Sequence, residues 1–224
     1  MAEAADRKRV AVLISGRGSN MAALIEAAKD PAYPAAIALV VSNRPDAAGL
    51  ARARADGIAT DVVDHTAFAG REAFERALDA RLNAERIDIV CLAGFMRVLT
   101  PWFVGRWPGR ILNIHPALLP AFPGLDTHAR ALEAGVRLHG ATVHVVAPEV
   151  DAGPIVAQGA VAVREDDSEE TLAARVLAVE HRLYPLALKL VAEGRVGLAG
   201  GRCRIAGART PEGALIAPLD AADS

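Results

Sequence analysis

The stretch Val12–Ala27, VLISGRGSNMAALIEA, joins an apolar run to a glycine-rich turn and then to an alanine-rich segment. The apolar run predicts a buried strand and the alanine-rich segment predicts a helix, so together they form the first half of a βαβ unit. We expect Ser19 or Asn20 to cap this helix. The free N–H groups at a helix start, together with the helix dipole, favour an anion, and glycines let it approach the backbone.

The glycine-rich turn matches neither common nucleotide-binding motif. The pattern G-x-x-x-x-G-K-[ST] is absent, and Met21 stands where the dinucleotide fingerprint has its third glycine. We therefore interpret Gly18, Ser19 and Asn20 as a site for a monophosphate. The same residues would also suit a tight turn that binds nothing.

The alternation of apolar runs and helical stretches continues along the chain to about residue 115. The apolar runs AAIALVVS, ATDVV, IDIVCLAG and RILNI alternate with charged or alanine-rich segments such as GREAFERALDARLNAE. Strands that are apolar throughout are typical of a parallel sheet covered by helices on both faces. The sequence thus predicts an α/β fold: an open, doubly wound, mostly parallel, Rossmann-like sheet over residues 9–115.

The chain changes character after residue 115. Two runs of period-two character, GATVHVVAP and PIVAQGAVAV, are joined by the turn EVDAGP and predict a mixed or antiparallel extension of the same sheet. A capping box at Ser168 and Thr171 opens a long C-terminal helix, which we expect to be kinked or restarted at Pro185. We expect one domain over 1–224, with halves 9–115 and 116–196, and a tail 197–224 that contains a small hairpin.

Composition excludes several classes of partner. The 224 residues include 25 basic and 27 acidic side chains, a formal charge of -2, which provides no field that would attract a nucleic acid. Cys91 and Cys203 lie far apart, as in a reduced intracellular protein. No apolar stretch is long enough for a signal peptide or a membrane span, so we expect a cytoplasmic protein without a membrane partner.

Two polar side chains end the predicted strand at residue 115. Asn113 and His115 are two residues apart, so they share a face at the carboxyl edge, where open α/β sheets bind ligands. An amide N–H can stabilise the oxygen of an attacked carbonyl while an imidazole handles a proton. The turn at Asp151 could bring a carboxylate to favour the protonated imidazole. Taken singly, each residue also fits a structural role, and no histidine cluster has the spacing of a zinc site.

The segment LAGFMRVLTP, residues 92–101, follows another predicted buried strand. It could line a flat apolar pocket and recognise a heterocycle through exposed backbone groups, or it could supply core residues before a helix at Pro101.

Five segments in this order resemble the phosphoribosylglycinamide formyltransferases, a folate-dependent family of purine biosynthesis. They are VLISGRGSN, CLAGFMRVLTP, ILNIHPALLPAFPGLDTHARALEAG, HGATVHVVAPEVDAGPIVAQ and AVEHRLYPLAL. The resemblance implies a formyltransferase fold and transfer of a formyl group from the co-substrate 10-formyltetrahydrofolate to the glycyl amine of glycinamide ribonucleotide. The products would be formylglycinamide ribonucleotide and tetrahydrofolate, and no metal is implied.

The resemblance also implies residue roles. It assigns Asn113, His115 and Asp151 to catalysis; Gly18, Ser19, Asn20 and Glu180 to the ribonucleotide; and Arg71, Met96, Arg97, Val98, Leu99 and Asn113 to the folate. The loop 147–151 would close over the pterin. Asp126 stands where many relatives carry histidine, so no role is carried over to it.

Alternative functions remain open at this point. A formyltetrahydrofolate hydrolase would share the catalytic half, but we expect it to carry a further N-terminal domain. A methionyl-tRNA formyltransferase would need a longer C-terminal part and a tRNA substrate. A non-catalytic nucleotide-binding module would use only the glycine-rich turn. The sequence is compatible with a monomer or a homodimer.

Overall fold

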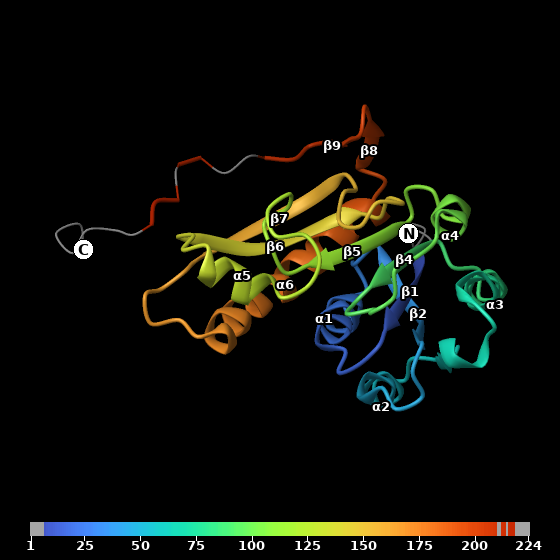
Figure 1. Ribbon diagram of the computed structural model, residues 1–224. Helices are drawn as coiled ribbons and strands as arrows, with labels where there is room; N and C mark the ends of the chain where they lie inside the picture. Colours follow the sequence, from blue (N-terminus) through green and yellow to red (C-terminus); the bar gives the residue numbers. More distant parts are fainter. Residues whose placement is uncertain (1–6, 210–211, 214, 218–224) are drawn as a thin grey trace.

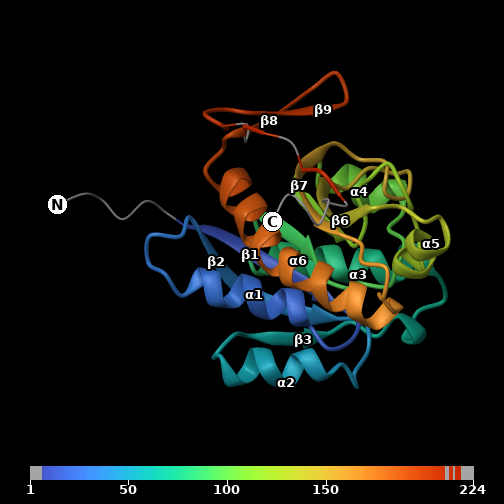
Figure 2. The same cartoon turned by 90° about the vertical axis from the view of Figure 1, so that its left-hand side faces the viewer.

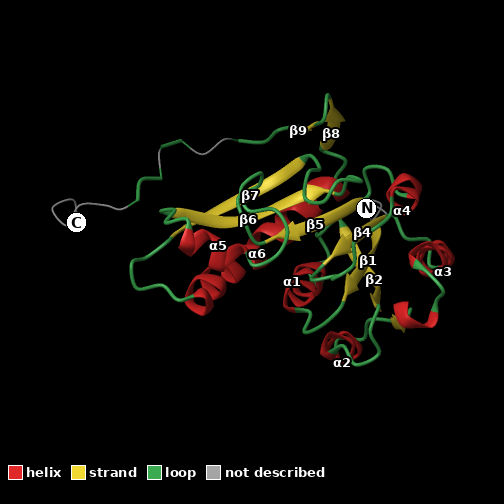
Figure 3. Cartoon of the chain, in the orientation of Figure 1, coloured by secondary structure: helices red, strands yellow, loops and turns green. Residues whose placement is uncertain are grey.

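A mixed sheet of seven strands forms the centre of the protein (Figures 1 and 3). The computed structural model describes residues 7–209, 212–213 and 215–217. The strand order is β3-β2-β1-β4-β5-β6-β7; the pairs from β3 to β5 are parallel, and β6 is antiparallel to both β5 and β7. The strands are β1 (Lys8–Ile14), β2 (Ala35–Ser42), β3 (Thr60–Val62), β4 (Ile89–Leu92), β5 (Ile111–His115), β6 (Leu138–Val145) and β7 (Ile155–Ala162). Both the predicted parallel half and the predicted antiparallel extension are confirmed.

Helices cover both faces of the sheet. Successive residues of β1 point to opposite faces, so they pack into two different cores. Val10, Val12 and Ile14 pack into the core formed with α1, α2, α5 and α6, whereas Ala11 and Leu13 pack into the core formed with α3 and α4. Figure 2 shows α1 and α6 running side by side across one face. The helices are α1 (Ser19–Ala28), α2 (Ala48–Ala55), α3 (Arg71–Ala84), α4 (Pro101–Arg106), α5 (Thr127–Glu133) and α6 (Glu169–Ala192), with a short 3-10 turn η1 (His65–Ala67).

The long helix α6 begins as predicted but does not restart. Ser168 accepts from the Thr171 N–H, and the Thr171 side chain accepts from Ser168, which completes the capping box. Pro185 lies inside one continuous helix, in a stretch where buried Tyr184 and Leu188 anchor the helix to the core.

After α6, β8 (Val196–Ala199) and β9 (Arg202–Ile205) form the predicted hairpin. In the described part of the chain, no helix is both long and apolar enough to cross a membrane.

Candidate active site

Two adjoining cavities lie at the carboxyl edge of the parallel strands. The large cavity, about 630 Å³, is lined by residues that follow β4, β5 and β6. The glycine-turn cavity, about 530 Å³, surrounds the turn 15–20. Asn20, Gly94, Met96 and Arg97 line both, so the two cavities form one cleft.

His115 lies at the end of β5 between a carbonyl and a carboxylate. Its Nε2 is 2.9 Å from the Phe122 carbonyl oxygen, and its Nδ1 is 3.4 Å from Asp151 Oδ2. A carbonyl oxygen can only accept, so Nε2 carries a hydrogen and any further proton goes to Nδ1, facing Asp151. The ring is therefore held between an acceptor at Nε2 and a carboxylate at Nδ1.

Asp151 reaches the site from the turn between β6 and β7. The residue has a left-handed backbone, φ 54°, and its Oδ2 accepts from the Gly124 N–H at 2.8 Å. Burial opposes ionisation of this carboxyl, but the His144 ring, the Gly124 N–H and His115 outweigh burial and lower the pKa of Asp151 below its ordinary value. Asp151 is therefore a carboxylate at neutral pH, and its turn reaches the edge beside His115, a contact that the sequence left as a possibility.

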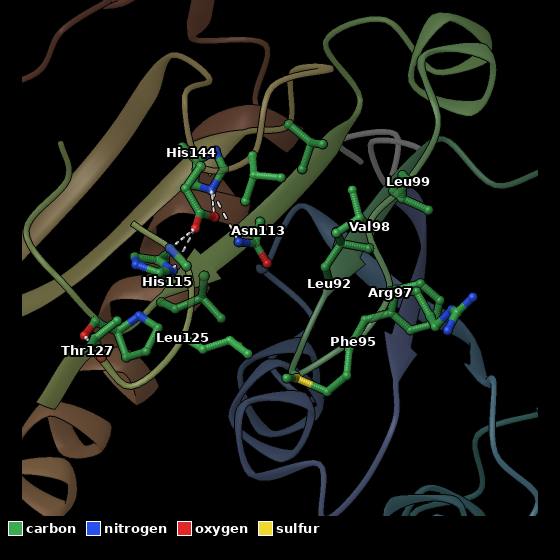
Figure 4. A pocket seen from close by; sticks show the side chains of 18 of the residues that line it. Leu92, Phe95, Arg97, Val98, Leu99, Asn113, His115, Leu125, Thr127 and His144 are labelled. Carbon is green, nitrogen blue, oxygen red and sulfur yellow. Dashed lines mark hydrogen bonds and ion pairs between the residues drawn. The ribbon is translucent and has the colours of Figure 1, made fainter. Parts of the chain in front are cut away.

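Asn113 and His144 face each other across the antiparallel pair β5–β6 (Figure 4). Asn113 Nδ2 is 3.2 Å from His144 Nε2, and His144 Nδ1 is 3.2 Å from the Val145 carbonyl oxygen. His144 Nε2 also lies 3.7 Å from Asp151 Oδ1, so the ring stands between the Asn113 amide and the Asp151 carboxylate. An amide N–H of Asn113 is available to the large cavity, which Asn113 lines. His144 is buried, at 2% exposed, and lines the large cavity.

Two further histidines, His128 and His139, pack against each other near the loop that follows β5. His139 is 1% exposed and meets His128 edge to face, with ring centroids 5.3 Å apart. Burial, reinforced by His128, lowers the pKa of His139 to about 4, so the ring is neutral at pH 7. Among the described residues, no three His, Cys, Asp or Glu side chains are grouped so that they could hold a metal ion.

The glycine turn differs from its prediction in one respect. The N-cap residue of α1 is Gly18, at φ 71°, and no side chain caps the helix, so the expectation that Ser19 or Asn20 would do so is wrong. Ser19 is already the first helical residue, and the Asn20 amide donates to Glu180 Oε2 on α6 at 2.7 Å. Burial raises the pKa of Glu180, and the hydrogen bond from Asn20 opposes this. The structure thus brings Gly18, Ser19 and Asn20 together with Glu180 in the cleft.

The segment Met96–Leu99 lines the large cavity, and both interpretations of it are partly correct. Met96 and Val98 are exposed, at 63% and 51%, whereas Leu99 is in the core and α4 begins at Pro101, capped by Thr100. Arg71 is the first residue of α3, is exposed, and lines neither cavity.

Sequence reasoning missed three polar residues of the glycine-turn cavity: Ser15, Asn43 and His65. Ser15 and Asn43 directly follow β1 and β2, so the carboxyl-edge rule that identified Asn113 could have found them. His65 follows the short strand β3 and begins η1.

Comparison with known proteins adds the family. The formyl transferase family model matches residues 8–188. The phosphoribosylglycinamide formyltransferase of Escherichia coli is 46% identical over 90% of this chain and 95% of its own length. A trifunctional purine biosynthetic protein of Gallus gallus is 51% identical, but the chain spans about a fifth of its length, 20%. The crystal structure of phosphoribosylglycinamide formyltransferase from Brucella melitensis has a TM-score of 0.81 and 56% identity, and covers 87% of this chain and 100% of that one. The chain belongs to the formyl transferase family.

Proposed function

We propose that this chain is a phosphoribosylglycinamide formyltransferase. It transfers a formyl group from 10-formyltetrahydrofolate to the glycyl amine of glycinamide ribonucleotide, a step of purine biosynthesis. The observation that carries the proposal is the contact of His115 with Asp151, 3.4 Å, beside Asn113 in a cleft that continues to the glycine turn. The named relatives support the choice of substrates.

Each end of the cleft would bind one of the two substrates. The backbone N–H groups at Gly18, Ser19 and Asn20 start α1 and would hold the phosphate, and the buried carboxyl of Glu180 would accept hydrogen bonds from the ribose side. The folate would lie in the large cavity against Met96, Arg97, Val98 and Leu99, with the loop 147–151 over it. A folate contact of Arg71, outside both cavities, remains a prediction.

The reaction requires stabilisation of a developing oxyanion and movement of a proton. The amine attacks the formyl carbon, and the free amide N–H of Asn113 donates to the developing oxygen; such a donor contributes about a hundredfold to a thousandfold in rate. Because the Phe122 carbonyl holds Nε2 of His115, the transferable proton is the one on Nδ1, beside Asp151. It passes to the departing folate nitrogen, directly or through a water molecule, as the bond between that nitrogen and the formyl carbon breaks. The proton that the attacking amine loses then replaces the one on Nδ1.

Both parts of the single domain would contribute to each end of the cleft, so residues 9–115 are not a separate nucleotide-binding half and residues 116–196 are not a separate folate and catalytic half. Residues 9–115 carry the glycine turn, the segment 96–99, Asn113 and His115, and residues 116–196 carry Asp151, the loop 147–151 and Glu180, before a tail that begins at 197. Both substrates are small molecules, and the enzyme would act in the cytoplasm as a monomer or homodimer.

The test is an assay of the purified protein with both substrates. We expect release of tetrahydrofolate and formation of the formylated ribonucleotide, each dependent on both substrates. Release of tetrahydrofolate without the ribonucleotide would favour a formyltetrahydrofolate hydrolase. Ligand binding without any release would leave only a non-catalytic nucleotide-binding module.

A further inference from the structure

A chain of buried hydrogen bonds crosses the floor of the glycine-turn cavity. The Met96 N–H lies 2.8 Å from Ser15 Oγ, Ser15 Oγ lies 2.6 Å from Asn43 Oδ1, and Asn43 Nδ2 lies 3.1 Å from His65 Nδ1. Ser15 and Asn43 are 8% and 2% exposed, so their polar atoms depend on these partners. The chain links the ends of β1, β2, β3 and β4, and nothing in the proposed function uses it.

The bonds in this chain have one consistent direction. The backbone N–H of Met96 can only donate, so Ser15 Oγ accepts it and gives its own hydrogen to Asn43 Oδ1. The Asn43 amide group then donates to His65 Nδ1. The reverse orientation of the amide would leave the Ser15 hydroxyl hydrogen without an acceptor among the described residues.

The competing partner of His65 Nδ1 is the Asn43 carbonyl oxygen, 2.9 Å away. If Nδ1 donated to that oxygen, the buried Asn43 amide would face a second donor and would have no acceptor in the described part of the chain. If Nδ1 accepts instead, that oxygen still has the backbone N–H of His65, at 3.4 Å, as its donor. Asp64 Oδ1 is 3.9 Å from Nδ1, beyond hydrogen-bond distance. Nδ1 is therefore the accepting nitrogen, and a neutral His65 carries its hydrogen on Nε2.

The surroundings of His65 suit an anion. The cavity that it lines also contains Arg17, Arg44 and Arg97, and none of its lining residues is acidic. The His65 side chain is 25% exposed, and its Nε2 has no partner within the described ranges. Arg44 is paired with Asp46 at 3.0 Å, which leaves Arg17 and Arg97 as the arginines of the cavity lining without that pairing. A nitrogen that must donate, beside these arginines, meets an oxyanion favourably.

We propose that His65 is a phosphate-binding residue whose Nε2–H tautomer is fixed by the relay from Met96 through Ser15 and Asn43. The ligand is a phosphate monoester, and this inference rests on the proposed function for its identity as the ribonucleotide. Because Ser15 also bonds Met96 of the folate segment, the relay connects the two ends of the cleft.

Substitutions that mimic one ring nitrogen at a time test the role of His65. His65→Asn keeps an amide near the Nδ1 position and should raise KM for the ribonucleotide about tenfold, the scale of one hydrogen bond to a charged group, with kcat and the folate KM nearly unchanged. His65→Gln places an amide N–H near the Nε2 position and should restore most of the affinity. His181→Asn, on α6 outside both cavities, is the matched control and should leave all constants unchanged.

Imidazole nitrogen NMR of the wild-type protein tests the tautomer without any variant. We expect a neutral Nε2–H form of His65 whose Nε2 resonance shifts when inorganic phosphate is added. A neutral Nδ1–H form, no response to phosphate, or a His65→Asn variant with wild-type ribonucleotide KM would overturn the proposal. A protein that shows the phosphate response but no formyl transfer would refute the proposed function and leave the phosphate site intact.

Discussion

The two ends of the cleft are built from different chemical groups. At the large cavity the polar groups are side chains, Asn113, His115, His144 and Asp151, supplied by β5, β6 and the turn before β7. At the glycine turn, backbone N–H groups at the start of α1 are added to the side chains of Arg17, Arg44, Arg97 and His65, and small residues allow a ligand to reach the backbone. In the proposed reaction, the end of the cleft formed by β5, β6 and the turn before β7 would serve chemistry, and the end at the start of α1 would anchor the phosphate.

This difference predicts how substitutions divide between rate and affinity. Removing a side chain at the large cavity should reduce kcat, because its contact is made with the reacting atoms. Disturbing the backbone at the glycine turn should raise KM for the ribonucleotide, because that contact persists throughout the reaction.

The largest effect is expected for Asp151→Asn. The change removes a charge, keeps the size, and takes away the carboxylate 3.4 Å from His115 Nδ1. We expect kcat to fall by about a thousandfold, within the range for a positioned proton-transfer group, with little change in either KM. Near wild-type rates across the pH range would contradict a role of Asp151 in proton transfer.

The same variant has a signature in stability. Because the pKa of Asp151 is lowered in the folded state, its ionisation stabilises the protein above the unfolded carboxyl pKa, and this contribution is lost as pH falls through the folded pKa. Urea unfolding should therefore show wild type more stable than Asp151→Asn at neutral pH, with a difference that shrinks below about pH 4. A constant difference would indicate that packing, and not charge, explains the loss.

Asn113→Leu should have the next largest effect. The substitution keeps the volume and removes the amide N–H groups, one of which lies 3.2 Å from His144 Nε2. We expect kcat to fall about a hundredfold while the ribonucleotide Kd, measured by calorimetry, stays within a few-fold. An equal loss in ribonucleotide affinity would place Asn113 in binding.

Ser19→Asp tests the anchoring end. A carboxylate in the first turn of α1 would repel the phosphate, and KM for the ribonucleotide should rise at least about tenfold, or ~1.4 kcal/mol. The folate KM is the internal control and should not change. Equal losses for both substrates would point to a structural defect.

Gly18→Ala should have the smallest effect of these. Its φ of 71° disfavours any residue with a Cβ, and that Cβ would lie 3.0 Å from Met21 Cε and 3.3 Å from Gly49 Cα. The strain of ~1–2 kcal/mol should lower the free energy of unfolding and raise the ribonucleotide KM a few-fold, with kcat unchanged. A reduced kcat with an unchanged KM would contradict the expected division between the two ends of the cleft, in which the glycine turn affects affinity and the large cavity affects rate.

The sequence predicted the elements better than the contacts. Apolar periodicity located every strand of the sheet and the long helix, because hydrophobic burial determines those patterns. Asn113 and His115 were identified as candidates because positions two apart at a strand end share one face of the sheet. The contact of Asp151 with His115 could be predicted only as a possibility, because it depends on the register of β6 and β7. The donation of Asn20 to Glu180 and the relay through Ser15 join residues far apart in sequence, and no local pattern encodes them.

The most direct test is single-turnover formyl transfer by His115→Asn at saturating concentrations of both substrates, with both Kd values measured on the same preparation. We predict binding within a few-fold of wild type and a transfer rate lower by at least about a hundredfold. Transfer within tenfold of the wild-type rate, with both substrates bound, would contradict the placement of the reaction at His115.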